Sequence, residues 1–262
     1  MIFDHYLNPI LLTVGPFSVR YYGLFIVLGI LSCLLLWRVL LKNNKAKFEV
    51  LFDLLVWLIV GGVIGARLGH IIFYELSYYL ANPLEIIMIH RGGLSSHGLT
   101  IGLVITFFLF VRIKKIQVKQ ILDLVILPLP ILIFLIRCAN FLNSEIVGRA
   151  TNGEWGVRFY AFEANPILRH PSQLYEAMLG ILILPVILWS YSHFNLKKKQ
   201  PYITFWLFIA LYFGSRFVVE YLKEYQTLEP GSYLTMGQYL SIPFVVIAII
   251  ALVILLKKPF KA

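Results

Sequence analysis

Seven apolar runs, each about long enough to cross a bilayer, limit what this chain of 262 residues can fold into. A transmembrane helix needs roughly 20 predominantly apolar residues, with a range of about 17–25. The composition agrees, because 60% of the residues are hydrophobic and only 14% are charged, whereas soluble domains carry about 25% charged residues. The sequence therefore predicts an all-α integral membrane protein with seven transmembrane helices in a single transmembrane domain, residues 1–262. The predicted spans are 22–41, 51–73, 94–111, 121–141, 176–191, 203–222 and 237–256.

The first run is expected to be a membrane span and not a cleaved signal peptide. It begins only after Arg20 and lacks a small-x-small cleavage motif. The two cysteines, Cys33 and Cys138, both fall in apolar stretches, so we expect buried apolar side chains and no disulfide framework. No residues have the spacing of metal ligands, and the sequence predicts neither a metal nor a cofactor.

The distribution of basic residues predicts the orientation. Fourteen of the 23 lysines and arginines lie in the segments after the first, third, fifth and seventh runs. By the positive-inside rule these segments face the cytoplasm, so the N-terminus lies outside and the C-terminus inside. The net charge of +10 is then a topology signal and does not indicate a nucleic-acid partner. Residues 142–175 become an extracytoplasmic loop region.

Polar residues within the spans are predicted to gather in the outer half of the membrane. At 1.5 Å per residue, Arg137 lies about 24 Å and Arg216 about 20 Å from the cytoplasmic start of its helix, in a hydrocarbon core of about 30 Å. A charge at the centre of a span costs about 2.5 kcal/mol or more, and usually marks a functional site. The sequence therefore predicts a site toward the outer leaflet. Further polar residues at outer helix ends are Tyr22, Arg67, His70, His97, Gln173, Tyr175, Glu176, Glu220 and Gln238.

The motif RGGLSSHG, residues 91–98, joins a glycine-rich loop to the start of a helix. Free N–H groups at a helix N-terminus favour anions, and glycines allow close approach of a ligand. His97 has the side chain of a general base. The alternative is a helix cap followed by a histidine hydrogen-bonded at the membrane interface.

The motif RCANFLNSEIVGR, residues 137–149, offers Arg137 as a fork for a phosphate group. Asn140 and Asn143 can act as donors, and Glu145 as a carboxylate partner. The alternative is a structural ion pair of Arg137 with Glu145 or Glu220.

The motif RHPSQLYEA, residues 169–177, resembles a helix start with Ser172 as its cap. Its functional interpretation is that Gln173 and Glu176 orient the arginines, and its structural one is capping and anchoring at the interface.

The motif YFGSRFVVEY, residues 212–221, places Tyr212, Arg216 and Glu220 on one helical face. The alternative is an intrahelical ion pair between Arg216 and Glu220. VRYYGL and TMGQYLSIP put aromatic and amide groups at helix ends, which is also typical of the aromatic belt.

These motifs, in this order, resemble the bacterial prolipoprotein diacylglyceryl transferase family, from VRYYGL to the last predicted helix. The resemblance implies an inner-membrane enzyme that transfers the diacylglyceryl group of phosphatidylglycerol to the lipobox cysteine thiol of a preprolipoprotein. A thioether forms and glycerol 1-phosphate leaves, as the first step of lipoprotein maturation. The partners it implies are phosphatidylglycerol, the lipobox segment and membrane lipids.

By matching position, the resemblance implies that the catalytic residues are His97, Arg137 and Arg216. We predict a substrate-binding set made of Tyr22, Arg137, Asn140, Glu145, Gly148, Gln173, Tyr212 and Glu220. The chain departs from the family pattern at Ile136 and Ala139, where the family carries glycine, so a local backbone difference is expected beside Arg137.

In the predicted mechanism His97 removes the thiol proton, and the two arginines hold the phosphate and stabilise its growing charge. The rival hypothesis is a transporter of an anionic lipid or solute that uses the same arginines. Transporters usually place such a site near the midplane, between repeated halves, and this sequence shows no repeat.

Overall fold

The computed structural model describes residues 1–262 except 16, 90–91, 225–232 and 258–262. Within the described residues seven helical segments are long and apolar enough to cross a membrane, so the predicted number of spans is confirmed. Arg91 of the predicted anion-binding loop, and Lys258 and Lys261 of the last basic cluster, lie outside the described residues. The seven segments are Tyr21–Leu40, Lys45–Tyr74, Ser96–Ile113, Val118–Leu142, Ser172–Lys197, Ile203–Leu222 and Met236–Lys257.

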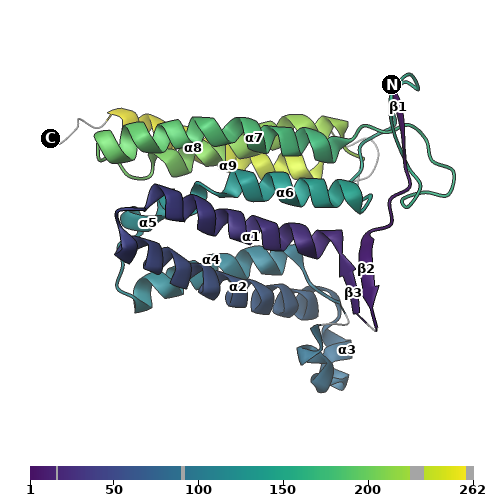
Figure 1. Cartoon of the computed structure of the whole chain (residues 1–262), viewed down its shortest axis with the longest axis horizontal. Coiled ribbons are helices and arrows are strands. Elements are labelled where there is room, and N and C mark those ends of the chain that lie inside the picture. Colours follow the sequence, from purple (N-terminus) through teal and green to yellow (C-terminus); the bar gives the residue numbers. More distant parts are fainter. Residues whose placement is uncertain (16, 90–91, 225–232, 258–262) are drawn as a thin grey trace. The chain divides into compact units, whose positions relative to one another are not determined.

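The chain forms two compact units, a larger one of residues 1–36 and 122–262 and a smaller one of residues 37–121. In the larger unit α6, α7, α8 and α9 lie side by side (Figure 1). Gly180 lets α7 approach α6 closely, since a Cβ there would lie 2.8 Å from the carbonyl oxygen of Pro130. The helices of this unit are most of α1 (Tyr21–Leu40), part of α5 (Val118–Ile126), α6 (Leu129–Leu142), α7 (Ser172–Ser190), η3 (Tyr191–Lys197), α8 (Ile203–Val219), η4 (Glu220–Leu222) and α9 (Met236–Lys257).

The smaller unit is held together by close packing of α2 (Lys45–Tyr74) against α4 (Ser96–Ile113). Glycines at every fourth position of α2 face glycines of α4: a Cβ on Gly65 would lie 2.6 Å from the Cα of Gly102. In a membrane, helix association depends on such van der Waals contact between small residues. In the sequence, two short helices connect α2 to α4: α3 (Leu76–Ala81) and η1 (Pro83–Ile87).

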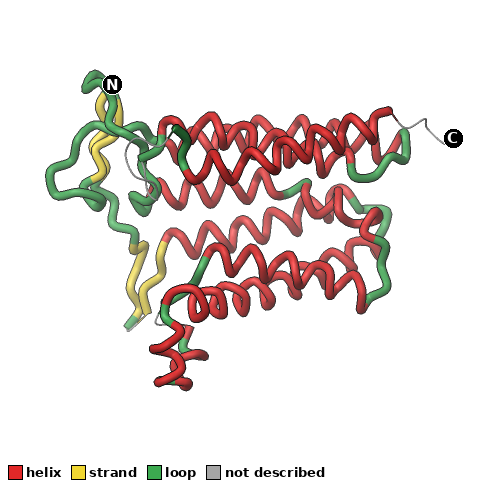
Figure 2. The backbone as a smooth tube through the Cα atoms, turned by 180° about the vertical axis from the view of Figure 1, so that it is seen from behind, coloured by secondary structure: helices red, strands yellow, loops and turns green. Residues whose placement is uncertain are grey.

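In the part of the chain that the structure describes, four short strands add to the predicted all-α fold (Figure 2). β1 (Ile2–His5) pairs in parallel with β4 (Gly156–Phe159), and β2 (Ile10–Val14) pairs antiparallel with β3 (Phe17–Arg20). In strands of four or five residues, too few positions alternate between apolar and polar for the sequence to identify them. A small apolar core of Val147, Val157 and Phe159, with Phe141 beside it, lies against β4.

The two prolines of the fourth span break it into two helices. α5 ends at Ile126 and α6 begins at Leu129, with Pro128 at its N-cap. Pro185 and Pro243 instead lie inside α7 and α9, as expected for membrane helices.

Large apolar side chains on the outside of the helices match a lipid environment. On α9, Ile247, Ile250 and Ile254 are each more than half exposed. The buried residues of α9 are small or polar instead, namely Gly237, Gln238, Ser241 and Ala248. This inside-out distribution is what a bilayer, whose tails are as apolar as leucine, requires of a span.

Candidate functional site

Arg137 lies in the last two turns of α6, with a side chain that is 12% exposed. Its Nε lies 2.8 Å from Oε2 of Glu176 on α7. That oxygen accepts no hydrogen bond within the described chain, so the contact is an ion pair without an aligned N–H. Nη1 donates to Oδ1 of Asn140 at 3.2 Å. A guanidinium has five N–H donors, and this is the one hydrogen bond that Arg137 forms with the described residues, so the other donors can serve an anion.

Glu176 also binds a lysine, through its second carboxylate oxygen. Lys223 Nζ donates to Oε1 of Glu176 at 2.9 Å and lies 3.3 Å from Oε2 of Glu220. Glu176 and Lys223 are only 6% and 5% exposed. Two cations, Arg137 and Lys223, therefore share one buried carboxylate between α6, α7 and the end of α8.

Backbone pairing between two loops places Lys223 beside Glu176. Gly148 forms an antiparallel bridge with Lys223, and the amide of Arg149 donates to the carbonyl of Leu222 at 2.9 Å. Any side chain at Gly148 would overlap the carbonyl oxygen of His170 and lie 2.8 Å from that of Leu222. Glycine at this predicted site position therefore serves loop packing.

Asn140 connects Arg137 to Glu145. Asn140 is buried, and its Nδ2 donates to Oε2 of Glu145 at 3.1 Å. Nδ2 of Asn143 donates to Oε1 of the same carboxylate at 3.2 Å. Gln173, which is fully buried, donates to the carbonyl of Glu145 at 2.7 Å.

Tyr22 lies at the start of α1, close enough to Asn140, Arg137 and Glu145 to interact with each of them. The structure therefore brings together Tyr22 and four further residues that the sequence predicts for the site, although they come from three separate segments. The four further residues, which are linked by hydrogen bonds, are Arg137, Asn140, Glu145 and Gln173.

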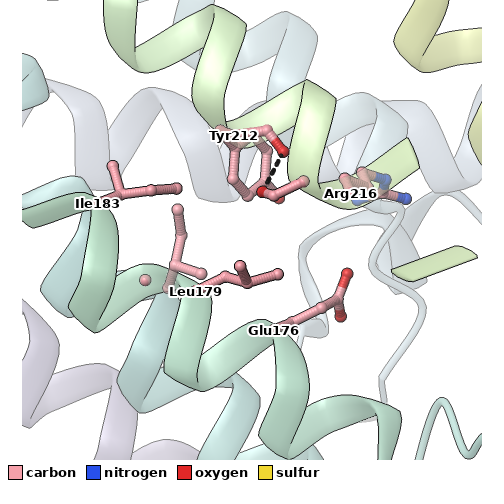
Figure 3. A pocket seen from close by; sticks show the side chains of 8 residues that line it. Glu176, Leu179, Ile183, Tyr212 and Arg216 are labelled. Atoms are coloured by element: carbon pink, nitrogen blue, oxygen red, sulfur yellow. Dashed lines mark hydrogen bonds between the residues drawn. The ribbon is translucent and has the colours of Figure 1, made fainter. Parts of the chain in front are cut away.

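A small cavity, partly open and with room for about one water molecule, lies between α6, α7 and α8. Figure 3 shows Glu176 and Arg216 at one end of it and Ile183 at the other. Tyr212 lines the cavity and stacks on Phe208 at 5.7 Å between ring centroids. The lining residues are Ile133, Glu176, Leu179, Gly180, Ile183, Tyr212, Ser215 and Arg216.

Arg216 has no carboxylate at ion-pair distance among the described residues, although Glu176 and Glu220 are near enough for electrostatic interaction. It is thus the arginine that faces the cavity without a direct acidic partner. Together with Arg137 and Lys223, Arg216 makes a set of three cations. Their formal charges are balanced by those of three carboxylates, Glu145, Glu176 and Glu220.

The ion pairs predicted as structural alternatives for Arg137 and Arg216 are wrong. Arg137 pairs with Glu176, and neither with Glu145 nor with Glu220, because α7 packs directly on α6. The intrahelical pair of Arg216 with Glu220 does not form, since α8 ends at Val219 and Glu220 opens the 3₁₀ turn η4. Glu220 pairs with Lys223 instead.

Ser172 does not cap α7. The helix begins at Ser172 with Pro171 at the N-cap, and the Ser172 hydroxyl donates to the carbonyl of Ile146 at 2.9 Å. The structure also shows no break in the helix at Ile136 and Ala139, which both lie inside α6. The backbone that carries Arg137 is therefore a regular helix, although Ile136 and Ala139 stand where the family pattern has glycine. The side chain of Ala139 is fully buried.

The smaller unit positions His97 in the first turn of α4. Ser95 is the N-cap and accepts a hydrogen bond from the amide of Gly98 at 3.2 Å, as the capping interpretation predicts. His97 itself is exposed and forms no hydrogen bond with the described residues, so the alternative of an interface histidine held by hydrogen bonds is not supported.

Arg67, on α2, holds the loop that leads to His97. Its guanidinium donates to the carbonyls of Gly92, at 2.7 Å, and Ile86, at 2.9 Å, and also to that of Glu85. It also lies over the ring of Tyr79, at 4.8 Å from the centroid. Arg67 is therefore a structural residue of this unit.

A second arginine fixes the loops of the larger unit. Arg169 binds both carboxylate oxygens of Glu163 at 2.9 Å and donates to the carbonyl of Gly148 at 3.2 Å. The Arg169 guanidinium lowers the pKa of Glu163. Burial lowers the pKa of His170, whose amide donates to the carbonyl of Arg149.

Lys223 is not among the site residues predicted from the sequence, because a lysine at the end of a span is typical of the membrane interface. The usable signal was its i, i+3 spacing from Glu220 at the end of a span. Among the described residues, no group of three or more His, Cys, Asp or Glu side chains is placed to hold a metal ion.

Comparison with known proteins gives consistent matches over nearly the whole chain. The family model described as prolipoprotein diacylglyceryl transferase matches residues 9–254. The phosphatidylglycerol–prolipoprotein diacylglyceryl transferase of Tolumonas auensis is 38% identical over 253 residues, which is 96% of each chain. That of Mesorhizobium japonicum is 38% identical over 267 residues, covering 97% of this chain and 92% of its own. That of Brucella anthropi is 36% identical over 257 residues, with 94% and 91% covered.

Proposed function

The chain belongs to the prolipoprotein diacylglyceryl transferase family, and from this premise we propose how its residues carry the reaction. It is a multi-pass membrane transferase whose substrates, by family, are phosphatidylglycerol and a prolipoprotein. In the proposed reaction the lipobox thiol loses its proton, and its sulfur attacks the glycerol carbon of the lipid. A C–S bond forms, the C–O bond to phosphate breaks, and glycerol 1-phosphate leaves with the electron pair.

The observation that carries this proposal is the amphiphilic cavity of the larger unit. One end presents Arg216 beside the buried Glu176, and the other is lined by Ile133 and Ile183. A phospholipid has the same division, with an anionic phosphate next to apolar acyl chains. We propose that the phosphate of the lipid binds at the end that holds Arg216 and that the start of its acyl chains lies along the apolar wall, which requires the cavity to widen when the lipid enters.

The two arginines are proposed to have different tasks. Arg216, which faces the cavity without a carboxylate at ion-pair distance, makes the first contact with the phosphate of the lipid. Arg137 is held by Glu176 and Asn140 and turns its remaining N–H donors to the leaving phosphate. Fixed donors aimed at developing charge lower the barrier most when they need no reorganisation.

His97 is proposed as the base that accepts the thiol proton. It is exposed in the first turn of a helix and forms no hydrogen bond with the described residues, so its imidazole can reach a substrate. A free cysteine has a pKa of about 8.5, and a positioned base contributes roughly 10²–10⁴-fold to rate.

We further propose that the site faces the outer leaflet of the bacterial inner membrane. The basic clusters after alternate spans support an outside N-terminus and a cytoplasmic C-terminus. Tyr22 and Tyr212 would bound the lipid headgroup, and Asn140, Glu145, Gln173 and Glu220 would orient the arginines.

The test uses the purified full chain in mixed micelles of detergent and phosphatidylglycerol with a lipobox peptide. Mass spectrometry should detect a peptide heavier by one diacylglyceryl group, joined through sulfur. Absence of this product would overturn the proposal, and lipid flux in proteoliposomes without product would support the transporter instead. His97→Ala with full activity would refute the base assignment alone.

A further inference from the structure

His5 is a buried polar residue that the proposed reaction does not use. It ends β1 and is 3% exposed. Its ring lies between those of Phe141, at 4.9 Å, and Phe159, at 5.5 Å between centroids. Nδ1 lies 3.3 Å from Oγ of Ser144, whereas Nε2 has no hydrogen-bond partner in the described chain. An apolar ring would fill this space without leaving a polar atom unpaired, so the imidazole is kept at a cost.

Its partner Ser144 belongs to a turn with two residues in the left-handed region. Ser144 has φ 55° and Ile146 has φ 56°, and neither is glycine. Such residues persist only where their surroundings fix them, and they cluster at functional sites. Here His5 contacts the first, and the Ser172 hydroxyl binds the carbonyl of the second at 2.9 Å.

Glu145 stands between these two residues. Its amide donates to the carbonyl of Asn140 at 2.9 Å, and its carboxylate accepts from Nδ2 of Asn140 at 3.1 Å. Asn140 in turn accepts from Arg137. A continuous series of contacts therefore runs from His5 through the strained turn to the proposed phosphate-binding arginine.

We propose that His5 is a positioning residue for Arg137, acting through its contact with Ser144. By holding Ser144 in the left-handed conformation, it fixes Glu145 and Asn140, and with them the direction in which Arg137 presents its donors. The inference rests on the proposed function of Arg137 and adds a residue outside the cavity to it.

The surroundings of the ring support this role. It is packed by α6 through Phe141, by β4 through Phe159 and by the turn through Ser144. The nearest charges on the two strands, Asp4 and Arg158, pair with each other at 3.2 Å. Burial lowers the pKa of His5, which keeps the imidazole neutral near pH 7.

The experiment compares two replacements of His5 in the full chain. His5→Phe keeps the aromatic packing and removes the contact with Ser144, whereas His5→Asn places a polar amide atom near the position of Nδ1. We expect kcat/KM for phosphatidylglycerol to fall about tenfold in His5→Phe, less than the ~10²-fold of a 1 Å misplacement. His5→Asn should stay within about threefold of wild type, although its melting temperature falls more because the ring is lost.

Ser144→Ala gives the second arm of the test. It should reproduce the loss in His5→Phe, and the double variant should be no worse than either single one, because both remove the same contact. Tyr6→Phe, in the exposed residue next to His5, is the matched control and should leave kcat/KM unchanged.

Three results would overturn the inference: His5→Phe with wild-type kcat/KM, His5→Asn as impaired as His5→Phe, or additive losses in the double variant. Failure of the proposed function looks different, because the wild-type chain would then form no thioether at all.

Discussion

Glu176→Gln is the change that most directly tests the charge arrangement of the site. The carboxylate lies 2.8 Å from Arg137 and 2.9 Å from Lys223, and it is 6% exposed. Glutamine keeps the shape and removes the charge, leaving two buried cations without the carboxylate they share. Breaking a buried ion pair by removing one partner costs about 3–5 kcal/mol, so we expect a loss of free energy of unfolding in this range.

The same change should reduce activity beyond its effect on folding. Without Glu176, repulsion from Lys223 and the loss of attraction both shift Arg137, and a displacement of about 1 Å at a catalytic group costs roughly 10²-fold. We therefore expect kcat/KM for phosphatidylglycerol to fall by about 10²-fold per folded molecule. The assay is thioether formation with a lipobox peptide, normalised to folded protein by thermal unfolding in the same detergent.

Two further variants make the test specific. Glu176→Gln with Lys223→Met removes one cation with the carboxylate, so stability should recover in part while kcat/KM stays low. Asp123→Asn is the matched control: this carboxylate is 2% exposed and accepts from the amides of Tyr202 and Phe205 at the start of α8. It should lower stability and leave kcat/KM per folded molecule unchanged. The reasoning is refuted if Glu176→Gln stays within threefold of wild type, or if Asp123→Asn loses as much activity.

Three other predictions concern packing, phosphate binding and pH. Gly65→Leu should prevent the close approach of α2 and α4 and lower the melting temperature far more than Gly23→Leu, where a Cβ meets nothing within 4 Å; equal effects would contradict the packing argument. Arg216→Lys keeps the charge but loses the planar fork, so KM for phosphatidylglycerol should rise about tenfold with a smaller change in kcat, and an unchanged KM would remove Arg216 from phosphate binding. The pKa values of His5 and His170 are lowered by burial, so the unfolded chain binds their protons first, and the free energy of unfolding should fall as pH drops below the usual histidine value of 6.5. A stability that rises between pH 7 and pH 5 in denaturation scans would contradict this sign.

The spans and the polar site residues could be predicted because the membrane imposes simple rules on sequence. A run of about 20 apolar residues has few alternatives to a helix. A charged residue such as Arg137 inside such a run is energetically costly and therefore indicates a functional site. The sequence shows that Arg137 and Arg216 are unusual without showing what they contact.

The partners could not be predicted, because they depend on how helices pack. The pairing of Arg137 with Glu176 depends on the rotation of α7 against α6. Whether Glu220 comes within ion-pair distance of Arg216 depends on where α8 ends, which is at Val219. The position of Lys223 in the site depends on backbone pairing with Gly148, in a loop about 75 residues earlier in the chain. His5 gave no signal at all, since one histidine beside short strands fits many structures.

The equality of three cations and three carboxylates bears on how the enzyme finishes its cycle. Phosphatidylglycerol brings one negative charge into a set of side chains whose formal charges already cancel. The released glycerol phosphate is a phosphate monoester, with about −1.5 to −2 charge at pH 7. The same arginines therefore face more negative charge after the bond breaks, while the proton taken from the thiol leaves one positive charge on the proposed base, His97. We therefore expect the proposed site to hold its donor lipid only loosely by charge and to release the water-soluble product instead of trapping it.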